Sequence, residues 1–264
     1  MNTVKRLIPK KLKPGIRRLF RAYKLRTRKT VLKASGRCPC CVRPTTFRAF
    51  DPWLRDYFLC DFCESIPRER ALMWTIDTFV PDWRTKVLHE SSPGTRGASI
   101  RLARECQHYV ASQYFPDIPA GNPVNGVRSE NLEALSFADE SIDLHVTQDV
   151  FEHIYDPAKA FKEIARTLRP GGAHIFTTPL VEKSAPTQRC ASLVDGKIVH
   201  LRTPEYHMNP VSAEGSLVTM RWGYDICDFI FKATGLFTHV VYIDALELGI
   251  RAEYIEVLVT RKPA

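Results

Sequence analysis

Four of the eight cysteines have the spacing of a metal site. Cys38 and Cys41 form one C-x2-C pair, and Cys60 and Cys63 form a second, with 18 residues between the pairs. Each pair can present two thiolates from one tight turn, and two such turns complete the tetrahedral shell of a structural zinc ion. Cys40 is left out, because pairing it with Cys41 leaves no room for such a turn. A redox-active dithiol is the alternative interpretation.

A second group of reactive side chains lies in DVFEH, which contains Asp149, Glu152 and His153. An apolar stretch precedes the group and an amphipathic stretch follows it, so the group lies where a strand gives way to a helix. A carboxylate or an imidazole in such a corner can accept a proton from a substrate. The alternative is that these side chains only order the loop.

Tyr206 and His207 belong to the same hypothesis, because residues 180–223 form a connection long enough to fold over that corner. We predict His153, His207 and Asp149 as the catalytic residues. For each of them a purely structural role is the alternative.

The elements that must position these residues follow from the pattern of apolar side chains. From Lys86 onward, short apolar runs alternate with amphipathic stretches, which is typical of a parallel sheet covered by helices. The predicted strands are 86–90, 108–112, 142–147, 173–178, 237–244 and 254–260, with a short seventh near 126–128. The predicted helices are 67–80, 98–105, 157–168 and 224–234. We therefore predict an α/β fold with a seven-stranded, mostly parallel sheet.

Two local signals sharpen this prediction. Asp156 can cap the helix at 157–168, Pro157 suits its first turn, and Pro170-Gly171-Gly172 ends it. Residues 245–253 are too few for a helical crossover, so the last strand should be antiparallel to its neighbour. His89 and His145 lie within predicted strands, where we expect structural roles.

Charge divides the chain into an arm and a body. Residues 1–37 hold 14 of the 38 Lys and Arg side chains and no acidic one, so the remainder carries 24 basic and 29 acidic side chains, a net charge of −5. Ile16, Leu19 and Phe20 have helical spacing among the basic residues, which suits an amphipathic helix on an anionic membrane. A solvated tail, nucleic-acid binding and mitochondrial targeting are the alternatives for this arm.

Composition excludes several classes of protein. An apolar fraction of 44% over 264 residues is enough for a packed core and excludes global disorder. The chain has no apolar run long enough to span a membrane and no apolar region typical of a secretory signal. Together with the clustered cysteines, this predicts a cytoplasmic protein, peripheral to the inner face of a membrane if the arm binds lipid. The predicted domains are the arm at 1–37, a four-cysteine zinc-binding module and linker helix at 38–80, and an α/β domain at 81–264 with an insertion at 180–223.

The segment SFADESIDLHVTQDVFEHIYDPAKAFKEIARTLRPGGAHIFTTP resembles the central block of class I, type 11-like S-adenosylmethionine-dependent methyltransferases. The most specific part of the resemblance is EH followed by E, R, L and PGG. It implies a Rossmann-like sheet, with S-adenosylmethionine bound at the carboxyl ends of the strands. A narrower resemblance, in PEYHMNP, GSL and WGYD, is to methyltransferases of bacterial polysaccharide and glycolipid gene clusters.

The resemblance also implies a set of cofactor-binding residues. The loop ESSPGTRG follows the first strand, with Glu90 one position later than the acidic residue of the family. Gln113 stands where the family has an acid for the ribose hydroxyls, and Asn131 stands where the adenine amine is bound. A full GxGxxG is not required, because a sulfonium cofactor carries no phosphate. The implied set is Glu90, Ser91, Gly94, Gln113, Asn131, Leu132 and Gln148.

These inferences predict an enzyme that methylates a sugar hydroxyl in a nucleotide sugar, a glycolipid or a polysaccharide pathway. Zinc ribbons also precede methyltransferase folds that modify rRNA, so an RNA methyltransferase is the first alternative, although the acidic body disfavours it. The second alternative is a non-catalytic binding module, which the altered glycine loop favours.

Overall fold

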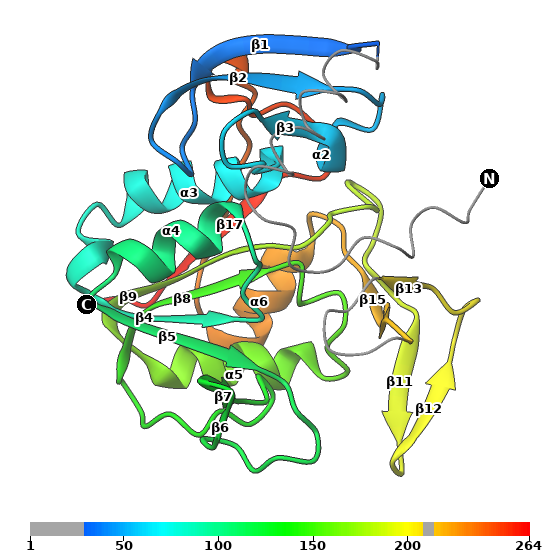
Figure 1. Ribbon diagram of the computed structural model, residues 1–264. Helices are drawn as coiled ribbons and strands as arrows, with labels where there is room; N and C mark the ends of the chain where they lie inside the picture. The colour runs from blue at the N-terminus through cyan, green and yellow to red at the C-terminus, as the bar shows by residue number, and fades with distance from the viewer. Residues whose placement is uncertain (1–28, 208–213) are drawn as a thin grey trace.

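The computed structural model describes residues 29–207 and 214–264, so most of the predicted arm lies outside the described residues. The described part begins with a small antiparallel sheet, β1-β2-β3, which lies at the top of the molecule in Figure 1. Its strands are β1 (Leu32–Arg37), β2 (Pro44–Ala49) and β3 (Phe58–Cys60), with the short helix α2 (Leu54–Tyr57) before β3. We call this unit, together with its two cysteine turns, the four-cysteine module. It begins before Cys38, because Leu32–Arg37 pairs with β2 and does not continue the arm.

The main sheet has eight strands in the order β16-β17-β9-β8-β4-β5-β7-β6. The strands β4, β5, β7, β8 and β9 are parallel to one another, and β17 runs antiparallel to both β9 and β16, as predicted for the last strand. The eighth strand, which the sequence analysis did not predict, is the two-residue β6 that extends the edge beyond β7. The strands are β4 (Val87–Ser91), β5 (His108–Gln113), β6 (Pro123–Val124), β7 (Val127–Ser129), β8 (Ile142–Gln148), β9 (Leu168–Thr177), β16 (Thr238–Val241) and β17 (Val257–Arg261).

Helices cover both faces of this sheet, as Figure 1 shows. One face packs against α3 (Pro67–Phe79) and α4 (Gly97–Glu105), and the other against α5 (Pro157–Thr167) and α6 (Ile226–Thr234). Each pair has its own apolar core. Short 3-10 turns, η1 (Trp83–Thr85) and η2 (Leu246–Leu248), complete the elements of the main domain. Asp156 caps α5 as predicted, by accepting a hydrogen bond from the Lys159 amide.

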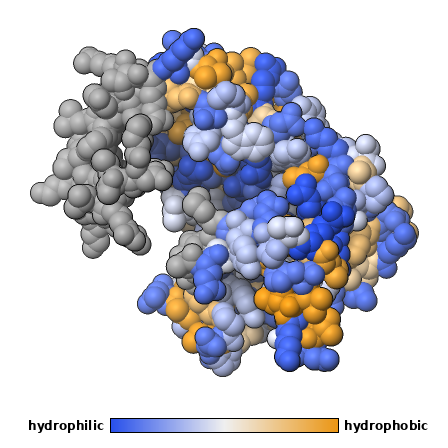
Figure 2. Space-filling model, turned by 90° about the vertical axis from the view of Figure 1, so that its right-hand side faces the viewer, coloured by the Kyte–Doolittle hydropathy of each residue, from blue (hydrophilic) through white to orange (hydrophobic). Residues whose placement is uncertain are grey.

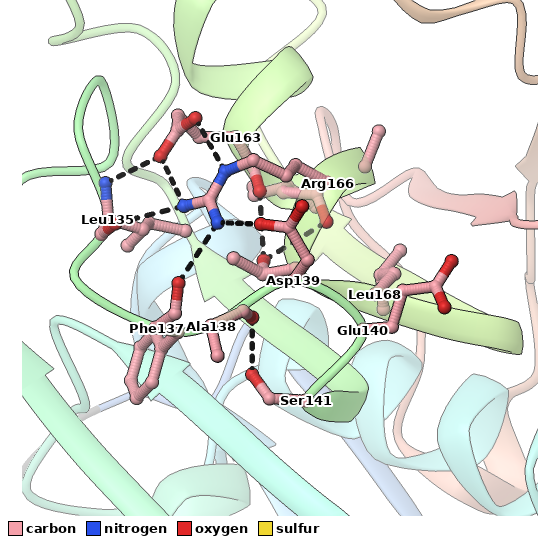
Figure 3. Close-up of polar contacts among 12 residues, drawn as sticks. Leu135, Phe137, Ala138, Asp139, Glu140, Ser141, Glu163, Arg166 and Leu168 are labelled. Carbon is pink, nitrogen blue, oxygen red and sulfur yellow. Dashed lines mark hydrogen bonds and ion pairs between the residues drawn. The ribbon is translucent and has the colours of Figure 1, made fainter.

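Two residues of the family-like segment form a structural clamp, drawn in Figure 3. Arg166 and Glu163 are one turn apart on α5 and form an ion pair of 2.7 Å. The Arg166 guanidinium also donates to the carbonyls of Leu135 and Phe137, and Glu163 accepts from the Leu135 amide. The E-x2-R spacing therefore fixes the loop that leads into β8.

His89 and His145, for which structural roles were predicted, form a hydrogen-bonded chain within the sheet. His145 Nε2 donates to Thr167 Oγ1, because that hydroxyl gives its own hydrogen to the Glu163 carbonyl. His145 Nδ1 therefore accepts from His89 Nδ1 at 2.8 Å, and His89 Nε2 accepts from Ser112. Burial lowers the pKa of His89 to about 3, so the chain of neutral rings is satisfied throughout.

The four-cysteine module is docked onto the carboxyl-terminal part of the chain. Arg70 is fully buried and donates to the backbone carbonyls of Ser65, Phe58 and Gly249. On the other side, a side chain at Gly36 would place its Cβ 1.7 Å from the Glu247 carbonyl oxygen. Only glycine allows β1 to approach η2 so closely.

The insertion between β9 and α6 consists of short antiparallel pairs, β10-β15, β11-β12 and β13-β14. The hairpin predicted at Asp195-Gly196 is β11 (Ala191–Val194) with β12 (Lys197–His200). The other strands are β10 (Gln188–Arg189), β13 (Tyr206–His207), β14 (Ser216–Leu217) and β15 (Met220–Arg221). Figure 2 views this side of the molecule, where hydrophobic surface lies in separate patches among hydrophilic side chains. Within the described residues, no helix has both the length and the apolar character needed to cross a membrane.

Candidate active site and metal-binding cluster

The four predicted cysteine ligands converge. Sγ of Cys38 lies 3.7 Å from Sγ of Cys63, and Sγ of Cys41 lies 3.9 Å from Sγ of Cys60. Four thiolates around zinc, at a Zn–S distance of about 2.3 Å in a tetrahedron, lie about 3.8 Å apart. The sulfur positions therefore have the spacing that a tetrahedral metal ion requires.

Both cysteine turns have the same backbone geometry. The residue after each pair, Val42 or Glu64, has a positive φ, of 58° and 59° respectively. Their amides donate to the carbonyls of Cys38 and Cys60, which closes each turn around its pair. Cys40 lies outside the sulfur set, as predicted, and its buried thiol contacts the Glu69 carbonyl.

The parallel strands bring several predicted site residues to one edge of the sheet. In the register of the sheet, Ser91 is beside both Ser112 and Thr147, and Gln148 is beside Thr177. These residues lie at the ends of β4, β5, β8 and β9. In open α/β sheets, this carboxyl edge is where ligands bind.

Glu90 organises the loop after β4. It is fully buried, and its carboxylate accepts hydrogen bonds from Ser99, Tyr109 and Gln148 at 2.6–2.8 Å. The Ser99 hydroxyl in turn accepts from the Gly94 amide. Burial raises the pKa of Glu90, although these three donors act in the opposite direction. Glu90 and Gln148 thus hold the shape of the predicted cofactor loop through their side-chain contacts.

The other predicted cofactor residues differ in exposure. Ser91 is buried at the end of β4, and Gly94 is exposed in the loop that follows. Gln113 is half-buried at the end of β5. Asn131 accepts a hydrogen bond from the Glu133 amide, and Leu132 packs in the core beneath α5 and α6.

Asp149 is held by two arginines that precede the main domain in sequence. Arg55 from α2 approaches Asp149 Oδ2 to 2.6 Å, and Arg68 from α3 approaches the same oxygen to 3.1 Å. Asp149 Oδ1 accepts from Thr177. Burial would raise the pKa of Asp149, but the two guanidinium groups hold it below its usual range. Asp149 therefore joins the four-cysteine module to the corner after β8, residues 149–153, which we call the cleft. Nothing in the sequence near Arg55 or Arg68 had pointed to this contact.

Glu152, His153 and His207 form a second cluster, in which one ligand atom from each residue lies within 4.8 Å of the others. The imidazole rings of His153 and His207 meet edge to face, with centroids 5.1 Å apart. Burial lowers the pKa of His153. Burial, and then the Asp149 carboxylate, raise the pKa of Glu152 to about 7. The insertion therefore does fold over the corner, as the prediction for His207 required.

A cavity of about 560 Å³ adjoins this cluster within the insertion. It shares a wall with the cluster, because Val218 lines the cavity and follows Leu217, whose carbonyl is 2.9 Å from His153 Nδ1. Glu205, which also lines the cavity, lies 3.4 Å from His207 and 3.4 Å from Arg221. The charged side chains of the lining are Glu182, Arg202, Glu205 and Arg221. The cavity therefore suits a polar ligand.

Comparison with known proteins finds similarity to methyltransferases. The family described as "Methyltransferase domain" matches residues 95–176. The chain is 39% identical over 62 residues to a probable S-adenosylmethionine-dependent methyltransferase of Mycolicibacterium smegmatis, a segment covering 24% of each chain. It is 41% identical over 54 residues to a dimethylglycine N-methyltransferase of Parasynechococcus marenigrum, covering 20% of this chain and 19% of that one.

The chain spans about a quarter or less of the length of the curated relatives that it matches. Among solved structures, an S-adenosylmethionine dependent methyltransferase from Mesorhizobium loti aligns with 73% of this chain and 98% of its own, with 17% identity and a TM-score of 0.48. Residues 95–176 extend from the loop after β4 into β9. Residues 95–176 are therefore similar to the methyltransferase domain of S-adenosylmethionine-dependent enzymes.

Proposed function

We propose that this chain transfers a methyl group from S-adenosylmethionine to a hydroxyl group of a saccharide. The observation that carries the proposal is that the methyltransferase segment contains a corner, Glu152-His153, which adjoins a polar cavity under the insertion. A saccharide acceptor has the hydroxyl groups that such a lining can hydrogen-bond.

The donor is proposed to lie along the carboxyl edge of β4, β5 and β8. When bound, it supplies a methyl group already activated by the sulfonium. The buried Glu90 accepts a hydrogen bond from Ser99, whose hydroxyl accepts from the Gly94 amide, so these contacts hold the loop in which Ser91 and Gly94 are proposed to meet the cofactor. Gln113 is proposed to meet the ribose and Asn131 and Leu132 the adenine.

The acceptor is proposed to lie against His153 and His207, with Asp149 positioning the corner through Arg55 and Arg68. Because a carbonyl oxygen can only accept, the Nδ1 of His153 that contacts Leu217 carries the hydrogen, and the Nε2 lone pair is available. A lone pair near the acceptor can assist removal of its hydroxyl proton. Alignment of the acceptor with the methyl group supplies most of the remaining rate acceleration.

The four-cysteine module is proposed to hold a structural zinc ion, which the sulfur spacing fits. Four thiolates fill the coordination shell, so the ion would stabilise the module and leave no position for a substrate. The basic arm, residues 1–33, is proposed to hold the enzyme at an anionic membrane surface.

An amine acceptor is the second candidate, and it rests on the dimethylglycine N-methyltransferase among the relatives. The experiment is to measure S-adenosylhomocysteine binding by calorimetry, and then methyl transfer from labelled cofactor to lipid-linked saccharides, nucleotide sugars, dimethylglycine and total RNA. We expect binding and transfer to a saccharide. Methyl transfer only to dimethylglycine or to RNA would refute the saccharide acceptor. No binding of S-adenosylhomocysteine at millimolar concentration would refute the methyltransferase activity.

A further inference from the structure

We propose that Glu152, His153 and His207 form a second metal site, which takes a divalent transition-metal ion through one carboxylate and two imidazoles. Two histidines and one carboxylate are a ligand set that suits such ions and leaves coordination positions open. This inference goes beyond the proposed function: in the metal-bound form Nε2 of His153 would be a ligand, and the ion would take its place beside the acceptor hydroxyl. Cation binding can be measured without cofactor or acceptor.

Glu152 supplies the first argument. The residue is 2% exposed, and the Thr178 hydroxyl donates to its Oε2. Oε1 accepts no hydrogen bond from the described residues, although it is buried. It lies 3.8 Å from Nε2 of His153. A buried carboxylate oxygen without a donor is costly, and a cation at this point would satisfy it.

The orientation of His153 supplies the second argument. Its Nδ1 donates to the Leu217 carbonyl, so the lone pair of Nε2 faces Glu152. Metal-binding histidines characteristically donate their other ring hydrogen to a carbonyl or a carboxylate, which fixes the tautomer and the ring orientation. His153 therefore already has the arrangement of an imidazole ligand.

His207 completes the set from another element. It ends β13 and pairs with Ser216 of β14, so the insertion delivers it to the corner. Gly215 permits this approach: its φ is +87°, and a Cβ there would lie 2.5 Å from the His207 carbonyl oxygen. The side chain of His207 is 41% exposed and therefore has room to move.

The spacing requires one adjustment. Ligands at about 2.1 Å from an ion lie about 3.0–3.4 Å apart in octahedral or tetrahedral geometry. The three ligand atoms lie within 4.8 Å of one another, and Oε1 of Glu152 lies 3.8 Å from Nε2 of His153, so the three side chains would close around the ion by less than about 2 Å. Side-chain rotation, chiefly of the half-exposed His207, would supply this adjustment, and the open coordination positions would face the acceptor side.

The test uses the untagged full-length protein with the four-cysteine site loaded. Co²⁺ is the probe, because thiolate ligands give intense charge-transfer absorption and a carboxylate–imidazole site does not. After exchange, the purified protein should bind two Co²⁺ ions per chain. One should show the thiolate charge-transfer bands of the four-cysteine site, and the other should lack them. His207→Ala and Glu152→Gln should each weaken the second equivalent by at least about 10-fold and leave the thiolate bands unchanged.

The matched control is His200→Ala, which removes an exposed imidazole from β12 of the same insertion. It should retain both equivalents. Thermal unfolding of each variant separates lost binding from lost folding. Binding of only one Co²⁺ ion per wild-type chain would overturn the proposal. So would a second Co²⁺ ion that still binds after both His207→Ala and Glu152→Gln. Calorimetry with S-adenosylhomocysteine on the same samples reports separately on the proposed function.

Discussion

The two clusters of metal-ligating side chains in this molecule are built in opposite ways. In the four-cysteine module, each ligand pair lies on one short turn, and the sulfur atoms are 3.7 and 3.9 Å apart, close to the spacing of an occupied site. At the corner after β8, Glu152 and His153 meet His207 only through the fold of the insertion, and Oε1 of Glu152 lies 3.8 Å from Nε2 of His153. The first arrangement closes a coordination shell, and the second leaves one open. The difference suits a structural role for the module and a chemical role for the cleft.

The two regions are nevertheless connected. Arg55 and Arg68 extend from the module and the helix that follows it to Asp149, which lies three residues before Glu152. Disorder in the module would therefore release the corner that carries the second cluster. We therefore expect substitutions to lower the free energy of unfolding most at the cysteines and less at the Arg55–Asp149 contact. At Glu152 we expect the opposite sign.

The largest effect is expected from Cys60→Ser. A structural zinc site of this kind contributes about 10–16 kcal/mol of binding free energy, which is also folding free energy for the module. We expect the module to unfold and to become sensitive to protease, measured by limited proteolysis and thermal unfolding. Cys227→Ser, at a cysteine on α6, is the control and should behave like the wild type. Equal protease resistance in both variants would show that the module does not depend on a metal.

An intermediate effect is expected from Arg55→Met. The side chains of Arg55 and Asp149 are only 12% and 17% exposed, so removing the cation leaves a largely buried carboxylate with Arg68 as its remaining cationic partner. We expect a loss of about 2–3 kcal/mol in the free energy of unfolding, measured by urea denaturation. A double-mutant cycle with Asp149→Asn should recover a coupling energy, whereas Arg251→Met, which breaks an exposed ion pair with Asp244, should change little. An uncoupled cycle would mean that module and cleft are independent.

The last substitution, Glu152→Gln, is expected to raise the free energy of unfolding, whereas the other two lower it. The folded-state pKa of about 7 lies above the ordinary value of 4.5, so the unfolded state loses this proton first as the pH rises. Ionisation thus lowers stability progressively from about pH 4.5 to about pH 7. Without added metal, Glu152→Gln should therefore be more stable than the wild type at pH 8, by up to about 3 kcal/mol, and should match it near pH 4.5.

Divalent metal should reverse this comparison at pH 8, because only the wild type keeps the full ligand set. Denaturation at the two pH values, with and without metal, measures all four conditions. A variant that is less stable than the wild type at pH 8 without metal would contradict the expected sign.

Most of the fold was accessible from local sequence signals. The helix at 157–168 has its own capping residue and stop signal, and the parallel strands are recognisable as apolar runs. The boundaries of the helix and of the parallel strands lie within about one or two residues of the predicted ones. The exception is β9, which starts earlier, at Leu168. The two-residue β6 was missed because so short a strand has no periodicity to detect. Leu32–Arg37 forms an antiparallel ladder with β2, and the basic composition of the segment does not reveal this pairing.

The sequence by itself determined the four-cysteine cluster and the position of DVFEH at the end of a parallel strand. Both can be recognised from residues that are close along the chain, because the C-x2-C spacing defines each cysteine turn and the apolar run before DVFEH defines the strand. Only the tertiary structure decided that Arg55 and Arg68 bind Asp149, that Glu90 is enclosed by three donors, and that His207 meets Glu152 and His153. These contacts join distant segments through the packing of the module and the insertion, and no local pattern specifies which polar groups a folded chain will bring together.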